Sequence, residues 1–235
     1  MRNVRTRQVL AFGLMVAANA ILCLGSYSLK SIGLSVPQES TLLILSATPA
    51  AILTLAGYWL ISATAANRPT RKATQWVSLI LFGKSIGWLL MTLLLKESGN
   101  LLYHGINGLL SLTGIIAMLY WLGVVVRNNS DSRQTRLSAH IYFAWNYGLA
   151  PILTLAPMFL PAEAAAATLQ LFQAASVVIG LACYCFLFMS PAFSGSSVQT
   201  KEVAHPYRIW NSYFTCYVIV IVFTLFMSLI IEAVS

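Results

Sequence analysis

The sequence predicts an all-α, polytopic integral membrane protein with seven transmembrane helices, its N-terminus inside and its C-terminus outside. Three observations predict this fold class. Of the 235 residues, 58% are hydrophobic and only 9% are charged, whereas soluble domains contain about 25% charged residues. The apolar residues form seven long segments, and thirteen of the fourteen basic residues lie outside these segments. A water-soluble domain is thereby excluded, and we expect a single transmembrane domain over residues 1–235.

Seven segments are long enough to cross a bilayer, which requires about 20 mostly apolar residues per helix. They occupy residues about 9–29, 41–65, 75–95, 101–126, 138–160, 165–189 and 209–231. The first follows a basic N-terminus, as the apolar region of a signal peptide does. It is longer than such a region and no small-residue cleavage motif follows it, so we expect an uncleaved helix.

The polar segments between the helices set the orientation. A net charge of +8 can indicate a nucleic-acid partner, but these basic residues adjoin apolar segments, which is typical of the positive-inside rule. Lys30 and Lys96 fall on one side of the expected bilayer. Eleven basic residues fall on the other: Arg2, Arg5, Arg7, Arg68, Arg71, Lys72, Arg127, Arg133, Arg136, Lys201 and Arg208. We expect a bacterial inner (plasma) membrane protein whose partner is the lipid bilayer, and no nucleic acid.

Prolines interrupt two of the expected helices. Pro49 lies about a third of the way along 41–65, where it removes a backbone hydrogen bond and is expected to bend the helix. Pro151 and Pro157 both lie in 138–160, which predicts a bent or interrupted helix. Broken helices near the middle of the membrane recur at transporter binding sites. Asn146, which precedes both prolines, is therefore a candidate ligand-binding residue.

Lys84 is the only charged residue deep inside an apolar segment. A lysine at the centre of a bilayer costs about 2.5–3.5 kcal/mol on insertion scales. It lies about ten residues, or roughly 15 Å, from either end of 75–95, too far to reach water easily. We expect it to be neutral, bonded to carbonyls or amides, or facing a wet cavity. Gly83 and Gly87 form a G-x-x-x-G pair, which predicts a close helix contact beside it.

Two helices carry stripes of polar and small residues. In 101–126 the stripe is His104, Asn107, Ser111, Gly114 and Met118, at spacings that place them on one helix face, so this face must meet protein or water. In 165–189 the stripe is Gln170, Gln173, Val177, Gly180 and Tyr184, and its glutamines could bond each other or Asn107. The candidate ligand-binding residues are therefore Lys84, His104, Asn107, Asn146, Gln170 and Gln173. We expect no catalytic residue.

Cysteine and histidine positions do not predict a metal site. The four cysteines lie in apolar segments, and Cys183 and Cys185 point about 200° apart on a helix, which is typical of apolar filling. His104 and His140 are expected at opposite membrane surfaces, about 39 Å apart, so they cannot bind one iron. His205 could approach His140, but two histidines are too few for a metal site.

Between residues 101 and 140 the chain carries a recognisable series of residues around a basic loop: His104, Gly108, Gly114, Met118, Tyr120, Trp121, Arg136, Leu137, Ser138 and His140. This series resembles a segment of the large subunit of haem–copper oxidases, particularly the cbb3 type, over about 40 of the 235 residues. The family's metal ligands are missing, because no adjacent histidine pair follows in 138–160 and no later helix is rich in histidine. The cofactor is unknown, and haem is kept only as an alternative.

Three classes of function remain. The leading hypothesis is binding or translocation of a small, in particular anionic, molecule, with Lys84 as its electrostatic anchor. The first alternative is a non-catalytic subunit or assembly factor of a membrane complex, which should copurify with other membrane subunits. The second is a membrane enzyme or haem-type redox protein that acts on lipid or quinone. Only six carboxylates are present and none lies at membrane depth, which disfavours an enzyme.

Overall fold

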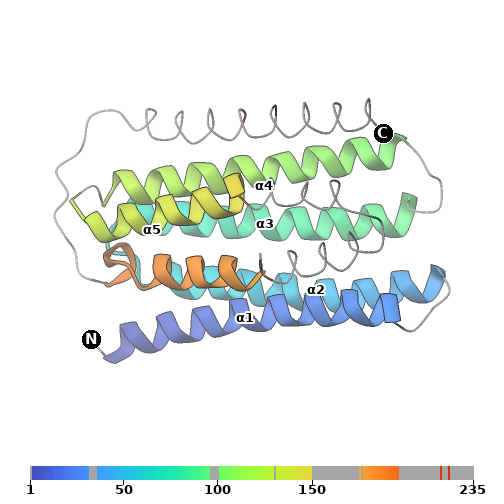
Figure 1. Cartoon of the computed structure of the whole chain (residues 1–235), viewed down its shortest axis with the longest axis horizontal. Helices are drawn as coiled ribbons and strands as arrows, with labels where there is room; N and C mark the ends of the chain where they lie inside the picture. Colours follow the sequence, from blue (N-terminus) through green and yellow to red (C-terminus); the bar gives the residue numbers. More distant parts are fainter. Residues whose placement is uncertain are drawn as a thin grey trace. The chain divides into compact units, whose positions relative to one another are not determined.

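Helices form all the regular secondary structure in the described part of the chain (Figure 1). The computed structural model describes residues 2–31, 36–95, 101–129, 131–149, 175, 177–195, 218 and 222. Its elements are α1 (Arg2–Ser31), α2 (Val36–Ser62), α3 (Arg68–Leu95), α4 (Leu101–Arg127), α5 (Arg133–Phe143), the π-helix η2 (Ala144–Leu149), a helical segment over 177–188, and the short 3₁₀ helix η4 (Pro191–Phe193). The predicted all-α class is confirmed.

Among the described residues, three helices are long and apolar enough to cross a membrane. They are Ile44–Ser62, Arg68–Leu94 and Gly105–Arg127. Large apolar side chains on them face outward, including Leu45, Leu94 and Leu109, and a lipid environment accommodates such surfaces. Of the expected helix at 209–231, only residues 218 and 222 belong to the described part of the chain.

The basic segment 68–72 precedes the helix predicted at 75–95, but in the structure it forms the start of α3 rather than a loop. The helix begins at Arg68 rather than near residue 75, and Arg68, Arg71 and Lys72 are exposed in its first turns. Asn67 accounts for this start, because its Oδ1 accepts a hydrogen bond from the Thr70 backbone N–H at 2.9 Å. Asparagine is among the preferred helix N-caps. The asparagine ahead of the basic run was the available sequence signal.

The sequence predicted a bend at Pro49. In the structure Pro49 lies inside α2, which is one continuous helix from Val36 to Ser62. On its far half, Gly57 allows α1 to approach closely. A Cβ added at Gly57 would lie 3.1 Å from the Ala11 carbonyl oxygen and 3.3 Å from the Met15 Sδ. A larger side chain at this position would push α1 and α2 apart.

The chain divides into two compact units. Unit 1 comprises Met1–Trp121 and Phe193–Val198, and unit 2 comprises Leu122–Ala192 and Gln199–Ser235. Within α4, the division falls between Trp121 and Leu122. The single transmembrane domain expected over 1–235 therefore stays a prediction.

An aromatic core joins the helices of unit 1. Trp121 is fully buried, and its indole Nε1–H donates a hydrogen bond to the Thr74 Oγ1 at 2.9 Å. The rings of Tyr58 and Trp121 pack edge to face, with centroids 5.6 Å apart. The Tyr58 hydroxyl donates to the Met118 Sδ at 3.6 Å. These contacts hold α2, α3 and α4 together at one level.

Residues 193–195 return to unit 1 from a distant part of the sequence. The Gln8 Nε2 donates to the Phe193 carbonyl oxygen at 3.1 Å, and the Gly195 N–H donates to the Thr64 carbonyl oxygen at 2.9 Å. Gly195 has a φ of +72°, and an added Cβ would lie 3.0 Å from the Val4 Cγ2. Glycine is favoured here by both the backbone conformation and the lack of space.

In unit 2, α5 changes to a π-helix before the proline pair. The α-helix ends at Phe143 and the π-helix η2 continues over Ala144–Leu149. Residues 150–174, which include both prolines, lie outside the described residues. Tyr142 packs against Tyr184 with ring centroids 4.7 Å apart. This contact joins α5 to the helical segment over 177–188.

Candidate functional site

A cavity of about 410 Å³ lies among α1, α2, α3 and α4 of unit 1. Ligand sites typically measure about 300–1,000 Å³, so this volume is large enough for a small molecule. The residues that line it are Leu22, Ala47, Ala50, Ala51, Thr54, Leu81, Phe82, Lys84, Ser85, Trp88, Asn107 and Ser111. The lining combines one cation with neutral polar groups and an apolar wall.

Small side chains on α2 create the space. Ala47, Ala50, Ala51 and Thr54 recur at helical spacing and therefore share one face of α2. The three alanines are at most 9% exposed, so they face neighbouring helices. This stripe was not predicted, because the prediction for this helix concerned only the bend at Pro49. The available signal was the run of small residues on one helix face.

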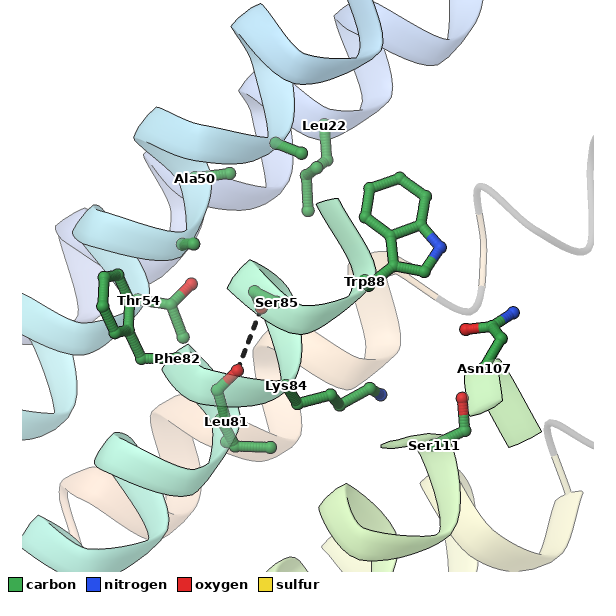
Figure 2. A pocket seen from close by; sticks show the side chains of 12 residues that line it. Leu22, Ala50, Thr54, Leu81, Phe82, Lys84, Ser85, Trp88, Asn107 and Ser111 are labelled. Atoms are coloured by element: carbon green, nitrogen blue, oxygen red, sulfur yellow. Dashed lines mark hydrogen bonds between the residues drawn. The ribbon is translucent and has the colours of Figure 1, made fainter. Parts of the chain in front are cut away.

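Lys84 reaches across the cavity from α3. Figure 2 shows its side chain extending toward Asn107 and Ser111 on α4. Among the described residues no hydrogen bond or ion pair involves its ammonium group. Of the three environments predicted for Lys84, the structure provides a cavity lined by neutral polar groups.

Gly114 provides the room that this lysine needs. A Cβ added at Gly114 would lie 2.8 Å from the Lys84 Cδ and 3.4 Å from its Nζ. The lysine side chain therefore lies against the backbone of α4. Gly114 belongs to the predicted polar stripe, but its contact with Lys84 was not predicted.

The stripe on α4 faces the interior of unit 1 from Asn107 to Met118, which confirms that prediction for the residues described. Asn107 and Ser111 line the cavity one helical turn apart, Gly114 contacts Lys84, and Met118 is buried. The side chain of Ser85, across the cavity, already donates to the Leu81 carbonyl oxygen at 3.0 Å. Asn107 and Ser111 are thus the neutral polar groups beside the ammonium.

The G-x-x-x-G prediction is correct for only one of its two glycines. An added Cβ at Gly87 would lie 3.3 Å from the Leu110 Cδ1, which shows that α3 and α4 approach closely there. Gly83 is exposed, and an added Cβ would meet nothing within 4 Å. The two positions differ by about 40° around the helix, and only Gly87 lies on the side that faces α4.

Of the four remaining predicted site residues, only Asn146 has a described side chain, and it belongs to unit 2. His104 lies on α4, but its side chain is outside the described residues, as are Gln170 and Gln173. Asn146 lies in η2 of unit 2, and its Nδ2 donates to the Tyr142 carbonyl oxygen at 3.0 Å. An added Cβ at Gly180 would lie 3.3 Å from the Asn146 Oδ1. Asn146 therefore makes its contacts within unit 2.

The chemistry of the cavity follows from its charge and donors. Among the described lining residues Lys84 is the single charged group, and no carboxylate or histidine accompanies it. An ammonium group attracts anions, and the Asn107 amide and Ser111 hydroxyl can donate hydrogen bonds to the same ligand. The arrangement is suited to binding an anion.

Comparisons with protein-family models, with curated proteins and with solved structures found no match. The resemblance of residues 101–140 to the cbb3-type oxidase subunit therefore stays a prediction from the sequence. No group of three histidine, cysteine, aspartate or glutamate side chains gathers among the residues that the structure describes.

Gly114→Ala is expected to yield a protein about 1 kcal/mol less stable than Gly108→Ala. At both positions the replacement of glycine by alanine stabilises the helix by about 1 kcal/mol, because alanine has the higher helix propensity. The new methyl group at 108 meets nothing within 4 Å, whereas the one at 114 would lie 2.8 Å from the Lys84 Cδ and displace the lysine. Denaturant unfolding of the purified variants in detergent measures the difference. Equal stabilities would show that Lys84 does not lie against Gly114.

Proposed function

We propose that this protein is a seven-helix inner-membrane protein, with its N-terminus inside, that binds or translocates a small anion in the cavity around Lys84. The observation that carries the proposal is an ammonium group in an apolar helix, without a partner among the described residues, that faces Asn107 and Ser111 across a cavity of about 410 Å³. The eleven-to-two distribution of basic residues supports the proposed orientation.

The energetic argument concerns the charge on Lys84. A charged group at membrane depth is costly unless a counter-charge or water accompanies it. No carboxylate lies among the described residues that line the cavity, so a bound anion would supply the missing counter-charge. Ion pairing and hydrogen bonds from Asn107 and Ser111 would together hold the anion.

The test measures anion binding by the purified full-length protein in nanodiscs, with radiolabelled acetate, hexanoate and phosphate. Lys84→Met is expected to weaken the binding of whichever of these anions binds wild-type protein by at least tenfold, since it removes the only cation from the described lining. The matched control is Lys72→Met, an exposed lysine near the start of the same helix, and it should leave binding unchanged. Uptake of the same anions into proteoliposomes then distinguishes translocation from binding alone.

Two results would contradict the proposal. One is wild-type protein that binds none of the three anions. The other is Lys84→Met protein, folded by circular dichroism, that binds them as tightly as wild type does.

A further inference from the structure

We infer that the ligand of this cavity is an amphipathic monocarboxylate, a molecule with one carboxylate group and a short apolar tail. The inference rests on the proposed anion-binding function and names the class of anion. It follows from three properties of the lining: its single charge, the position of the hydrogen-bond donors Asn107 and Ser111, and the apolar side chains that make up most of the remaining described lining.

The charge of the lining sets the charge of the ligand. Lys84 is the one charged residue among the twelve described residues that line the cavity. It can neutralise one negative charge. The second charge of a sulfate or hydrogen phosphate dianion would be left without a partner beside a largely apolar wall, which is energetically unfavourable. A monovalent anion is therefore favoured over a divalent one.

The donors match a carboxylate head group. Asn107 and Ser111 lie one turn apart on α4, and the Lys84 side chain points toward them (Figure 2). A carboxylate has two oxygens with about four sites that accept hydrogen bonds. It can accept from the ammonium, the amide and the hydroxyl together.

The remainder of the cavity is suited to an apolar tail. Leu22 on α1 and Ala47, Ala50 and Ala51 on α2 contribute only aliphatic side chains, and Trp88 adds an indole ring. A volume of about 410 Å³ holds on the order of a dozen water-sized groups at about 30 Å³ each. Beyond the three heavy atoms of the carboxylate, this leaves room for roughly nine methylene-sized groups.

The test compares ligands that differ in one property at a time. Binding to the full-length protein in nanodiscs is measured for acetate, butyrate, hexanoate, octanoate and palmitate, for phosphate and sulfate, and for hexanol. Each added methylene group should tighten binding about threefold to fourfold. Hexanol, which lacks the charge, and both inorganic anions should bind at least tenfold more weakly than hexanoate. Parallel incubations with protein-free nanodiscs correct for partitioning into lipid.

A pair of variants on α2 tests the part of the cavity that is proposed to hold the apolar tail of the ligand. Ala50→Leu adds side-chain volume at a cavity-lining position, whereas Ala56→Leu adds it at an exposed position on the same helix. Ala50→Leu should weaken octanoate binding at least tenfold and leave acetate binding within twofold of wild type. Ala56→Leu should change neither.

The outcomes separate this inference from the proposed function. Binding that strengthens through octanoate and is no tighter for palmitate supports a soluble acid with a short tail. Binding that continues to strengthen to palmitate supports a fatty acid from the bilayer, and both results support a monocarboxylate. Lys84-dependent binding of phosphate or sulfate without any dependence on tail length would overturn the inference and leave the proposed function standing. The absence of all Lys84-dependent anion binding would overturn both.

Discussion

Trp121→Ala is expected to lower the free energy of unfolding by about 3 kcal/mol, the lower end of the range for buried aromatic truncations. The side chain is 0% exposed, it packs edge to face against Tyr58, and it donates a hydrogen bond to Thr74 on another helix. Removing it leaves a void where three helices meet. The low end of the range applies because lipid is as apolar as a protein core, so packing rather than water exclusion is lost.

Two further variants separate the contributions of burial and of the hydrogen bond to this loss of stability. Trp76→Ala removes the same side chain from α3 at a position that is 64% exposed, and it should change stability by less than about 0.5 kcal/mol. Trp121→Phe retains most of the packing and removes the indole N–H, so it should cost about 1 kcal/mol. Denaturant unfolding in detergent, followed by circular dichroism, provides the measurement. If Trp121→Ala and Trp76→Ala lowered the free energy of unfolding by the same small amount, the aromatic core would not stabilise unit 1.

Lys84→Met is expected to raise the stability of the unliganded protein by about 2 kcal/mol, because it removes most of the cost of a lysine at membrane depth. Methionine retains an unbranched side chain of similar length, so the space beside Gly114 stays filled. Together with the expected loss of anion binding, this would be a gain in stability at the expense of function. Such a combination distinguishes a ligand-binding lysine from a structural one.

The measurement is the same unfolding experiment in anion-poor buffer, with Lys72→Met as the exposed control. Lys72→Met should not change stability measurably, since its side chain is in contact with solvent. A large destabilisation by Lys84→Met would instead assign the ammonium a structural bond, and it would remove the main argument for a ligand at this position.

Part of the candidate site could be predicted from the sequence because its signals are local. Lys84 is conspicuous as a charge within an apolar segment, and Asn107, Ser111 and Gly114 follow helical spacing on one face of α4. The cavity-lining alanines of α2, Ala47, Ala50 and Ala51, were not predicted because alanine has no distinctive chemistry. Asn146 was selected for its neighbouring prolines, yet its side chain donates to the Tyr142 carbonyl oxygen four residues earlier. Spacing alone does not distinguish such a local hydrogen bond from a ligand site.

The sequence by itself determined the helical class and three of the segments that are long and apolar enough to cross a membrane, because every backbone polar group in lipid must be satisfied within its own helix. It also predicted that the face of α4 from Asn107 to Met118 meets protein or water, and this face lies toward the interior of unit 1. Only the tertiary structure decided that the Lys84 side chain lies against Gly114 and that residues 193–195 return to Gln8 and Thr64. These contacts join residues far apart in the chain, and the packing of particular side chains selects them rather than any local periodicity.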